Sequence, residues 1–229
     1  MNYSINRRPN RKTASVNVLP DNSVSITVPD HLSEDEIDRI IKKKKQWILK
    51  KKALNNEVRK AVKPKEFVSG EAFPYLGRNY RLKVKYGEFS PVSYIDARLS
   101  VGVDGSASKQ VQHDFIRQSL IDWYMKHALE KFKQRYKKYA TLLNVKAKDL
   151  KLGNLKSQWG SCHLDKTIVF NWKVIMAPMS IVDYVVAHEL CHLVHHDHSK
   201  GFWSLLNRIM PDYAERKDWL RINGGLLEI

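Results

Sequence analysis

Two histidines and a glutamate in the segment His188-Glu189-Leu190-Cys191-His192 have the spacing of a catalytic metal site. On a helix, residues i and i+4 lie on one face a turn apart, so His188 and His192 can bind one ion while Glu189 lies beside it. This HExxH pattern is typical of zinc hydrolysis. We therefore expect the two histidines to bind Zn²⁺ and Glu189 to act as the general base.

A catalytic zinc ion has three protein ligands and one open position for water, so a third ligand is needed. Three ligands on one straight helix would be too collinear for a tetrahedron, and the chain must turn back after His192. His198 follows His188 by ten residues, as in the pattern HExxHxxGxxH, and is the expected ligand. The turn would place His196 or Asp197 in a left-handed conformation. The other candidates are His195, His196, Asp197 and, from a later helix, Glu215.

The expected chemistry is hydrolysis by activated water. Zinc held by imidazoles lowers the pKa of its water towards about 7 and polarises a scissile carbonyl. Glu189 would take the proton of the water and deliver it to the leaving amine. A purely structural zinc site is disfavoured because such sites use four protein ligands, commonly cysteines. Cys191 faces away from His192 on the helix and is expected to pack.

The elements that must position these residues are predicted downstream of residue 108. A capping box, Ser180-x-x-Asp183, opens a largely apolar helix that carries the HExxH segment. A long amphipathic helix is expected over 111–139, and strands over 148–156 and 167–174. The sequence thus predicts an α+β domain over 109–229, with a long backing helix, a small mixed sheet and the metal-binding helix.

Residues 1–108 are expected to form a separate, β-rich region with one basic helix. Alternation predicts a hairpin of strands 15–19 and 23–28, and further strands over 80–86 and 97–101. Residues 102–108 are small and polar, as in a linker. A Ser33-x-x-Glu36 capping box begins the helix between these strands.

The basic helix has two interpretations. Residues 39–65 contain twelve Lys or Arg and one acid, Glu57, within a chain of net charge +16, which suits DNA or an acidic protein partner. The lysines that would bind it are Lys42, Lys43, Lys44, Lys45, Lys50, Lys51 and Lys52. Alternatively, these lysines form only the solvated face of an amphipathic helix. Its apolar residues would be Ile37, Ile40, Ile41, Trp47, Ile48 and Leu54.

Composition narrows the class of protein. The 229 residues, 43% of them hydrophobic, suffice for a sizeable core. No apolar run has the length of a membrane span, and the first residues lack the apolar region of a secretory signal. The only cysteines are Cys162 and Cys191, and a reduced compartment is the simpler expectation. We expect a cytoplasmic protein.

Motifs along most of the chain resemble the YgjP-like metallopeptidases, relatives of the SprT-like zincins. The resemblance implies a zincin-like catalytic half, a zinc ion and a peptidase, with His198 at the family's third histidine. Its SprT-like relatives suggest substrates bound to DNA. The downstream matches are Trp159-Gly160-Ser161-Cys162, Phe170-Asn171-Trp172, Ala177-Pro178, Asp183 to Val186, His188 to His192, His198-Ser199, Phe202-Trp203 and Pro211-Asp212-Tyr213. The upstream matches are Arg7-Arg8, the hairpin, Lys45-Gln46-Trp47-Ile48 and Tyr75-Leu76-Gly77-Arg78.

Substrate recognition leaves alternatives open. In zincin-like enzymes the strand before the metal helix offers its edge to a peptide, which indicates either Trp159-Gly160-Ser161 or the segment around Asn171. Tyr213 either donates to an oxyanion or belongs to a helix stop. Two other functions remain: hydrolysis of a small amide, or nucleic-acid binding by a module whose zinc is not catalytic.

Overall fold

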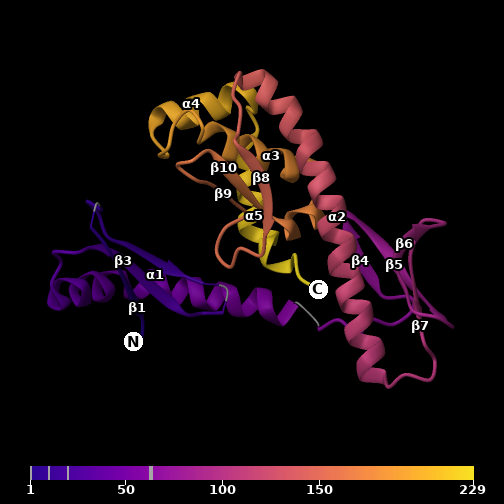
Figure 1. Ribbon diagram of the computed structural model, residues 1–229. Coiled ribbons are helices and arrows are strands. Elements are labelled where there is room, and N and C mark those ends of the chain that lie inside the picture. The colour runs from indigo at the N-terminus through magenta and orange to yellow at the C-terminus, as the bar shows by residue number, and fades with distance from the viewer. Residues whose placement is uncertain (1, 10, 20, 62–63) are drawn as a thin grey trace. The chain divides into compact units, whose positions relative to one another are not determined.

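The chain divides after residue 63 and not at the expected boundary of residue 108. Contacts group Met1–Lys63 and Pro64–Ile229 into two units. The computed structural model describes residues 2–9, 11–19, 21–61 and 64–229 (Figure 1). The difference arises because Leu82 and Leu99, on strands that were assigned to the first region, share one hydrophobic core with Leu120 of the helix that follows.

The first unit is a three-stranded sheet covered by one helix. Strand β1 runs parallel to the central β3, and β2 runs antiparallel to it, as the predicted hairpin requires. The Ser33 capping box is confirmed, since the backbone N–H of Ser33 donates to Glu36 Oε2 at 2.9 Å. Its elements are β1 (Ser4–Arg8), β2 (Ser15–Val18), β3 (Val24–Pro29) and α1 (Glu34–Ala61).

Helix α1 buries a narrow apolar stripe. Ile37, Ile41 and Ile48 pack on the sheet, whereas Trp47 is 43% exposed, contrary to its expected place on the apolar side. The side chain of Leu54 lies outside the described residues. Lys42 to Lys45 and Lys50 are exposed, and Lys51 and Lys52 are half-buried. The helix is therefore amphipathic with a strongly cationic outer surface.

The second unit begins with a four-stranded sheet in the order β4-β5-β7-β6, in which only β5 and β7 are parallel. One face of this sheet packs against α2 (Lys109–Leu143) through Leu99, Val101 and Leu120. The strands are β4 (Ala72–Tyr75), β5 (Arg78–Tyr86), β6 (Ser90–Ile95) and β7 (Arg98–Val103). The sequence predicted β5 and β7. It did not predict the two edge strands, β4 and β6.

A small mixed sheet follows α2, as predicted. Its order is β8 (Asp149–Gly153), β10 (Thr167–Asn171), β9 (Gly160–Cys162), with β10 parallel to β8 and antiparallel to β9. The expected strand over 167–174 ends early because the Asn171 side chain accepts a hydrogen bond from Lys173 N and caps a 3-10 helix, Trp172–Met176. The α+β class is confirmed.

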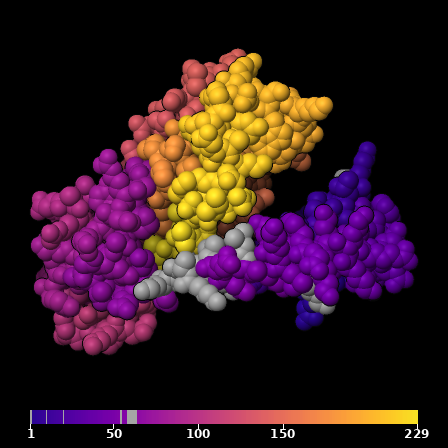
Figure 2. Space-filling view, turned by 180° about the vertical axis from the view of Figure 1, so that it is seen from behind, coloured from indigo at the N-terminus to yellow at the C-terminus, as the bar shows by residue number. Residues whose placement is uncertain are grey.

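Three helices complete the second unit. They are α3 (Met179–Cys191), α4 (Lys200–Ile209) and α5 (Tyr213–Asn223). Leu206 of α4 and Leu220 of α5 join the same core as Leu190 of α3. Figure 2 shows the C-terminal residues in yellow, packed over the orange residues of this unit. Within the described ranges, no helix combines the length and hydropathy that a membrane crossing requires.

The expected Ser180-x-x-Asp183 capping box is wrong. Helix α3 begins at Met179 after Pro178, without a side-chain cap. Asp183 is only 8% exposed and instead forms a two-pronged ion pair with Arg135 of α2, in which Arg135 Nη2 donates to Asp183 Oδ2 at 2.9 Å. Bidentate pairing of this kind fixes both groups. The pair therefore holds α3 against α2.

Candidate metal centre

Three histidines converge at the end of α3. His188 lies in the last turn, His192 is the capping residue, and His198 comes from the loop that precedes α4. Their ligand nitrogens lie within 4.8 Å of one another, and they form the one such group found among the described residues. His188 Nε2 and His198 Nε2 are 3.1 Å apart. Two nitrogens bound tetrahedrally to one zinc lie about 3.3 Å apart, so the spacing fits zinc.

The chain turns back after α3 without the expected left-handed residue. Neither His196 nor Asp197 has a positive φ, so that part of the expectation is wrong. Instead, His195 N donates to Cys191 O at 2.9 Å, and Asp197 Oδ1 accepts from Ser199 N at 3.2 Å. One backbone and one side-chain hydrogen bond therefore stabilise the reversal of the chain that brings His198 towards α3.

An aromatic pair that the sequence reasoning did not assign to the site packs around the three imidazoles. The fully buried ring of Phe202 lies 4.9, 4.6 and 4.8 Å from the ring centroids of His188, His192 and His198. Trp203 stacks on His198 at 5.5 Å. The position of Phe202 and Trp203 soon after His198 in the sequence could have indicated that they lie beside the histidines. Packing on these rings limits the orientations that the ligands can adopt.

The three histidines are neutral at physiological pH, which favours binding of a metal cation. Burial lowers the pKa of His188 to about 3, and burial also lowers the pKa values of His192 and His198. Neutral imidazole is the form that binds metals. His192 Nδ1 donates to the carbonyl oxygen of His195 at 3.0 Å, which leaves Nε2 free to be a ligand. The residues present therefore fit a divalent metal.

Glu189 is held in a tight space beside the histidines. It is 5% exposed, and burial raises the pKa of its carboxyl group to about 8. A Cβ atom at Gly160 would lie 2.6 Å from Glu189 Cγ and Oε1. No side chain fits at residue 160 while Glu189 keeps this position, so Gly160 has a steric role in the site.

The histidines and Glu189 face a cleft of about 390 Å³. The expected residues Trp159, Gly160 and Ser161 line it. Asn171 does not: it is 2% exposed on the central strand β10, and its side chain donates to the carbonyl oxygens of Leu155 and Gln158. Because β9 is an edge strand and β10 is central, the Trp159–Ser161 segment, and not the segment around Asn171, lies at an edge of the sheet.

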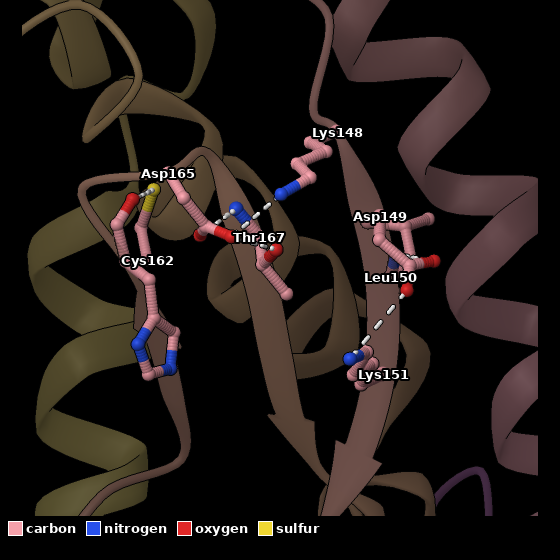
Figure 3. A network of polar contacts seen from close by, with 8 residues as sticks. Lys148, Asp149, Leu150, Lys151, Cys162, Asp165 and Thr167 are labelled. Carbon is pink, nitrogen blue, oxygen red and sulfur yellow. Dashed lines mark hydrogen bonds and ion pairs between the residues drawn. The ribbon is translucent and has the colours of Figure 1, made fainter.

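A network of polar contacts closes the β9–β10 hairpin that borders the cleft (Figure 3). Asp165 accepts hydrogen bonds from the Thr167 backbone and hydroxyl, each at 3.0 Å, and pairs with Lys148 at 3.1 Å. Hydrogen bonding, first from the Thr167 backbone, lowers the pKa of Asp165 to about 2. This turn fixes the position of the edge strand. Cys162, at the end of β9, lines the cleft as a free thiol.

Tyr184 is a cleft residue that the sequence reasoning missed. It lies one helical turn before His188, on the same face of α3, with the ring centroids 5.7 Å apart. Burial raises the pKa of Tyr184 to about 12, so its hydroxyl remains a hydrogen-bond donor. By contrast, Tyr213 stacks on Trp203 at the start of α5 and does not line the cleft. Glu215 is exposed and lies outside the histidine group.

Comparison with known proteins gives one match over most of the chain. The family model described as YgjP-like, metallopeptidase domain, matches residues 12–223. A search of the curated proteins found no match. The crystal structure of the metallopeptidase zymogen of Pyrococcus abyssi abylysin is 22% identical, with a TM-score of 0.38, over 42% of this chain and 94% of that chain.

Proposed function

The chain belongs to the YgjP-like metallopeptidase family, and on this premise we propose that it hydrolyses peptide bonds with zinc held by His188, His192 and His198. The family implies a divalent metal and a protein or peptide substrate. The observation that supports zinc and this ligand set is the convergence of three neutral imidazoles and the buried carboxyl group of Glu189 on one cleft. Imidazole suits zinc, and three ligands leave a position open.

Each side chain of the site has a distinct task in this proposal. When bound, zinc supplies an activated water and polarises the scissile carbonyl. Glu189 accepts the proton of the water and passes it to the leaving amine. Tyr184 donates a hydrogen bond to the developing oxyanion. The free edge of β9 holds the substrate as an added strand, which sets the carbonyl beside Glu189.

Metal removal tests this function. We expect the purified protein to cleave unfolded casein, to lose that activity on treatment with a zinc chelator, and to recover it when zinc is added back. Cleavage unchanged by chelation, after elemental analysis confirms that the metal has gone, would contradict the proposal. Chelator-sensitive hydrolysis of small amides without cleavage of casein would instead favour the small-amide hydrolase.

A second candidate function is DNA binding by α1, which would bring the peptidase to DNA-associated proteins. Lys42 to Lys45 and Lys50 are exposed, and within the described ranges none of them forms an ion pair. Unpaired cations in a row attract phosphates. The Glu189→Gln variant separates the peptidase from a nucleic-acid-binding module with a non-catalytic zinc, because only the module would retain its function in that variant.

Replacement of Lys43, Lys44 and Lys50 by glutamine tests the role of α1. We expect weaker binding to labelled duplex DNA in fluorescence anisotropy, and a slope of log K against log salt that is smaller by about 3, because each phosphate contact contributes roughly 0.9. The charge-matched control is Lys126→Gln with Lys133→Gln and Lys137→Gln on the exposed side of α2. Equal affinity in the two variants would show that α1 is only solvated.

A further inference from the structure

A second cationic site lies on the outer face of the β5–β7–β6 sheet. Alternation along β5 directs Leu82 into the core and Lys83 and Lys85 to the opposite face. On the neighbouring β7, Leu99 is buried against α2, and Arg98 and Ser100 lie on the outer face. The register places Lys83 beside Ser100. Figure 1 shows this sheet beside α2.

These side chains surround a hollow of about 300 Å³, which none of the functions above uses. Its lining consists of Lys83, Lys85, Ile95, Asp96, Arg98 and Ser100. Three of these residues are cations and one is an acid, so the lining has a net charge of +2. No ion pair among the described residues includes Lys83, Lys85 or Arg98. The cations therefore repel one another, and Asp96 offsets only one of their three charges.

The β6–β7 turn holds this arrangement in place. Asp96 and Ala97 have φ values of 50° and 58°, as in a two-residue turn that joins paired strands. Ser100 is 6% exposed, so the floor of the hollow is fixed within the sheet. The long side chains thus project from paired strands whose backbone is fixed, so that only the side-chain rotamers need to be ordered when an anion binds.

We propose that this hollow binds consecutive phosphates of a nucleic-acid strand. Lys83 and Lys85 lie two residues apart on one strand, about 6.6 Å, so a linear polyanion can contact both in turn. The guanidinium of Arg98 can contact a phosphate with two hydrogen bonds. No aromatic side chain lines the hollow, so it offers no platform for stacking bases. The site is therefore expected to bind phosphates without preference for a nucleotide sequence.

Substitution of the three cations tests the proposal, with binding of a labelled oligothymidine measured by fluorescence anisotropy at several salt concentrations. The parent is the full-length chain with Lys43, Lys44 and Lys50 replaced by glutamine, so that α1 does not mask the result. We expect Lys83→Gln with Lys85→Gln and Arg98→Gln to weaken binding at least about tenfold. The salt slope should fall by about 2, since each contact to a single strand contributes roughly 0.7.

Two further variants make the test specific. The charge-matched set Lys126→Gln, Lys133→Gln and Lys137→Gln should leave the slope nearly unchanged. Asp96→Asn removes the one acid of the lining and should tighten binding several-fold, a gain that misfolding could not produce. Absence of binding by the parent, equal slopes in the two triple variants, or stronger competition by polyglutamate than by unlabelled oligothymidine would overturn the proposal. None of these outcomes bears on casein cleavage.

Discussion

Replacing Glu189 by glutamine is expected to lower kcat for casein cleavage by about 10²–10⁴-fold, the usual contribution of a general base. The amide has nearly the same size as the carboxylate and fits beside Gly160, where space is restricted. It cannot accept the proton of the water. The loss should therefore appear in kcat, measured from initial rates with the substrate at saturation.

The control for this variant is Glu215→Gln, which removes an exposed carboxylate from the first turn of α5. It should retain full activity. The zinc content of Glu189→Gln should equal that of the wild type, because Glu189 is not one of the three proposed ligands. Cleavage at the wild-type rate by Glu189→Gln would remove Glu189 from the mechanism.

Replacing His198 by alanine is expected to weaken zinc binding by more than about a hundredfold. Loss of a partner around a ligand already costs roughly 10–100-fold, and loss of the ligand itself costs more. Competition with a chromogenic chelator measures the affinity. An independent measurement is the rise in Tm on addition of zinc, which reflects binding to the folded state and should be smaller in this variant.

Two of the other candidate ligands, His196 and Glu215, serve as controls for His198. His196 is exposed in the same loop and lines the cleft but lies outside the ligand group, so His196→Ala should keep wild-type affinity. Glu215→Ala should do so as well. Zinc affinity that falls in Glu215→Ala and not in His198→Ala would transfer the third ligand to the glutamate.

The parts of the site that the sequence predicted depend on spacing along one helix. His188, Glu189 and His192 are placed by the helical repeat, and this repeat follows from the apolar pattern of α3. His198 was predicted from its ten-residue separation, and the structure brings it to His188. The turn between them was not predictable in detail, because it depends on hydrogen bonds such as that of Asp197 with Ser199.

The features that the sequence reasoning missed depend on contacts between distant residues. Asp183 has the spacing of a cap, but its partner is Arg135, 48 residues away. Gly160 has no visible role until β9 brings it against Glu189. The expected boundary at residue 108 was wrong because small polar residues also form short connections within a unit that shares one core. Local patterns do not contain this information.

The most direct measurement is the zinc content of the wild type, His198→Ala and Glu189→Gln, determined by elemental analysis on the samples used for casein cleavage. We expect about one zinc per chain in the wild type and in Glu189→Gln, much less in His198→Ala, and cleavage by the wild type alone. Full zinc content in His198→Ala, or undiminished cleavage by Glu189→Gln, would contradict a three-histidine zinc peptidase with Glu189 as its base.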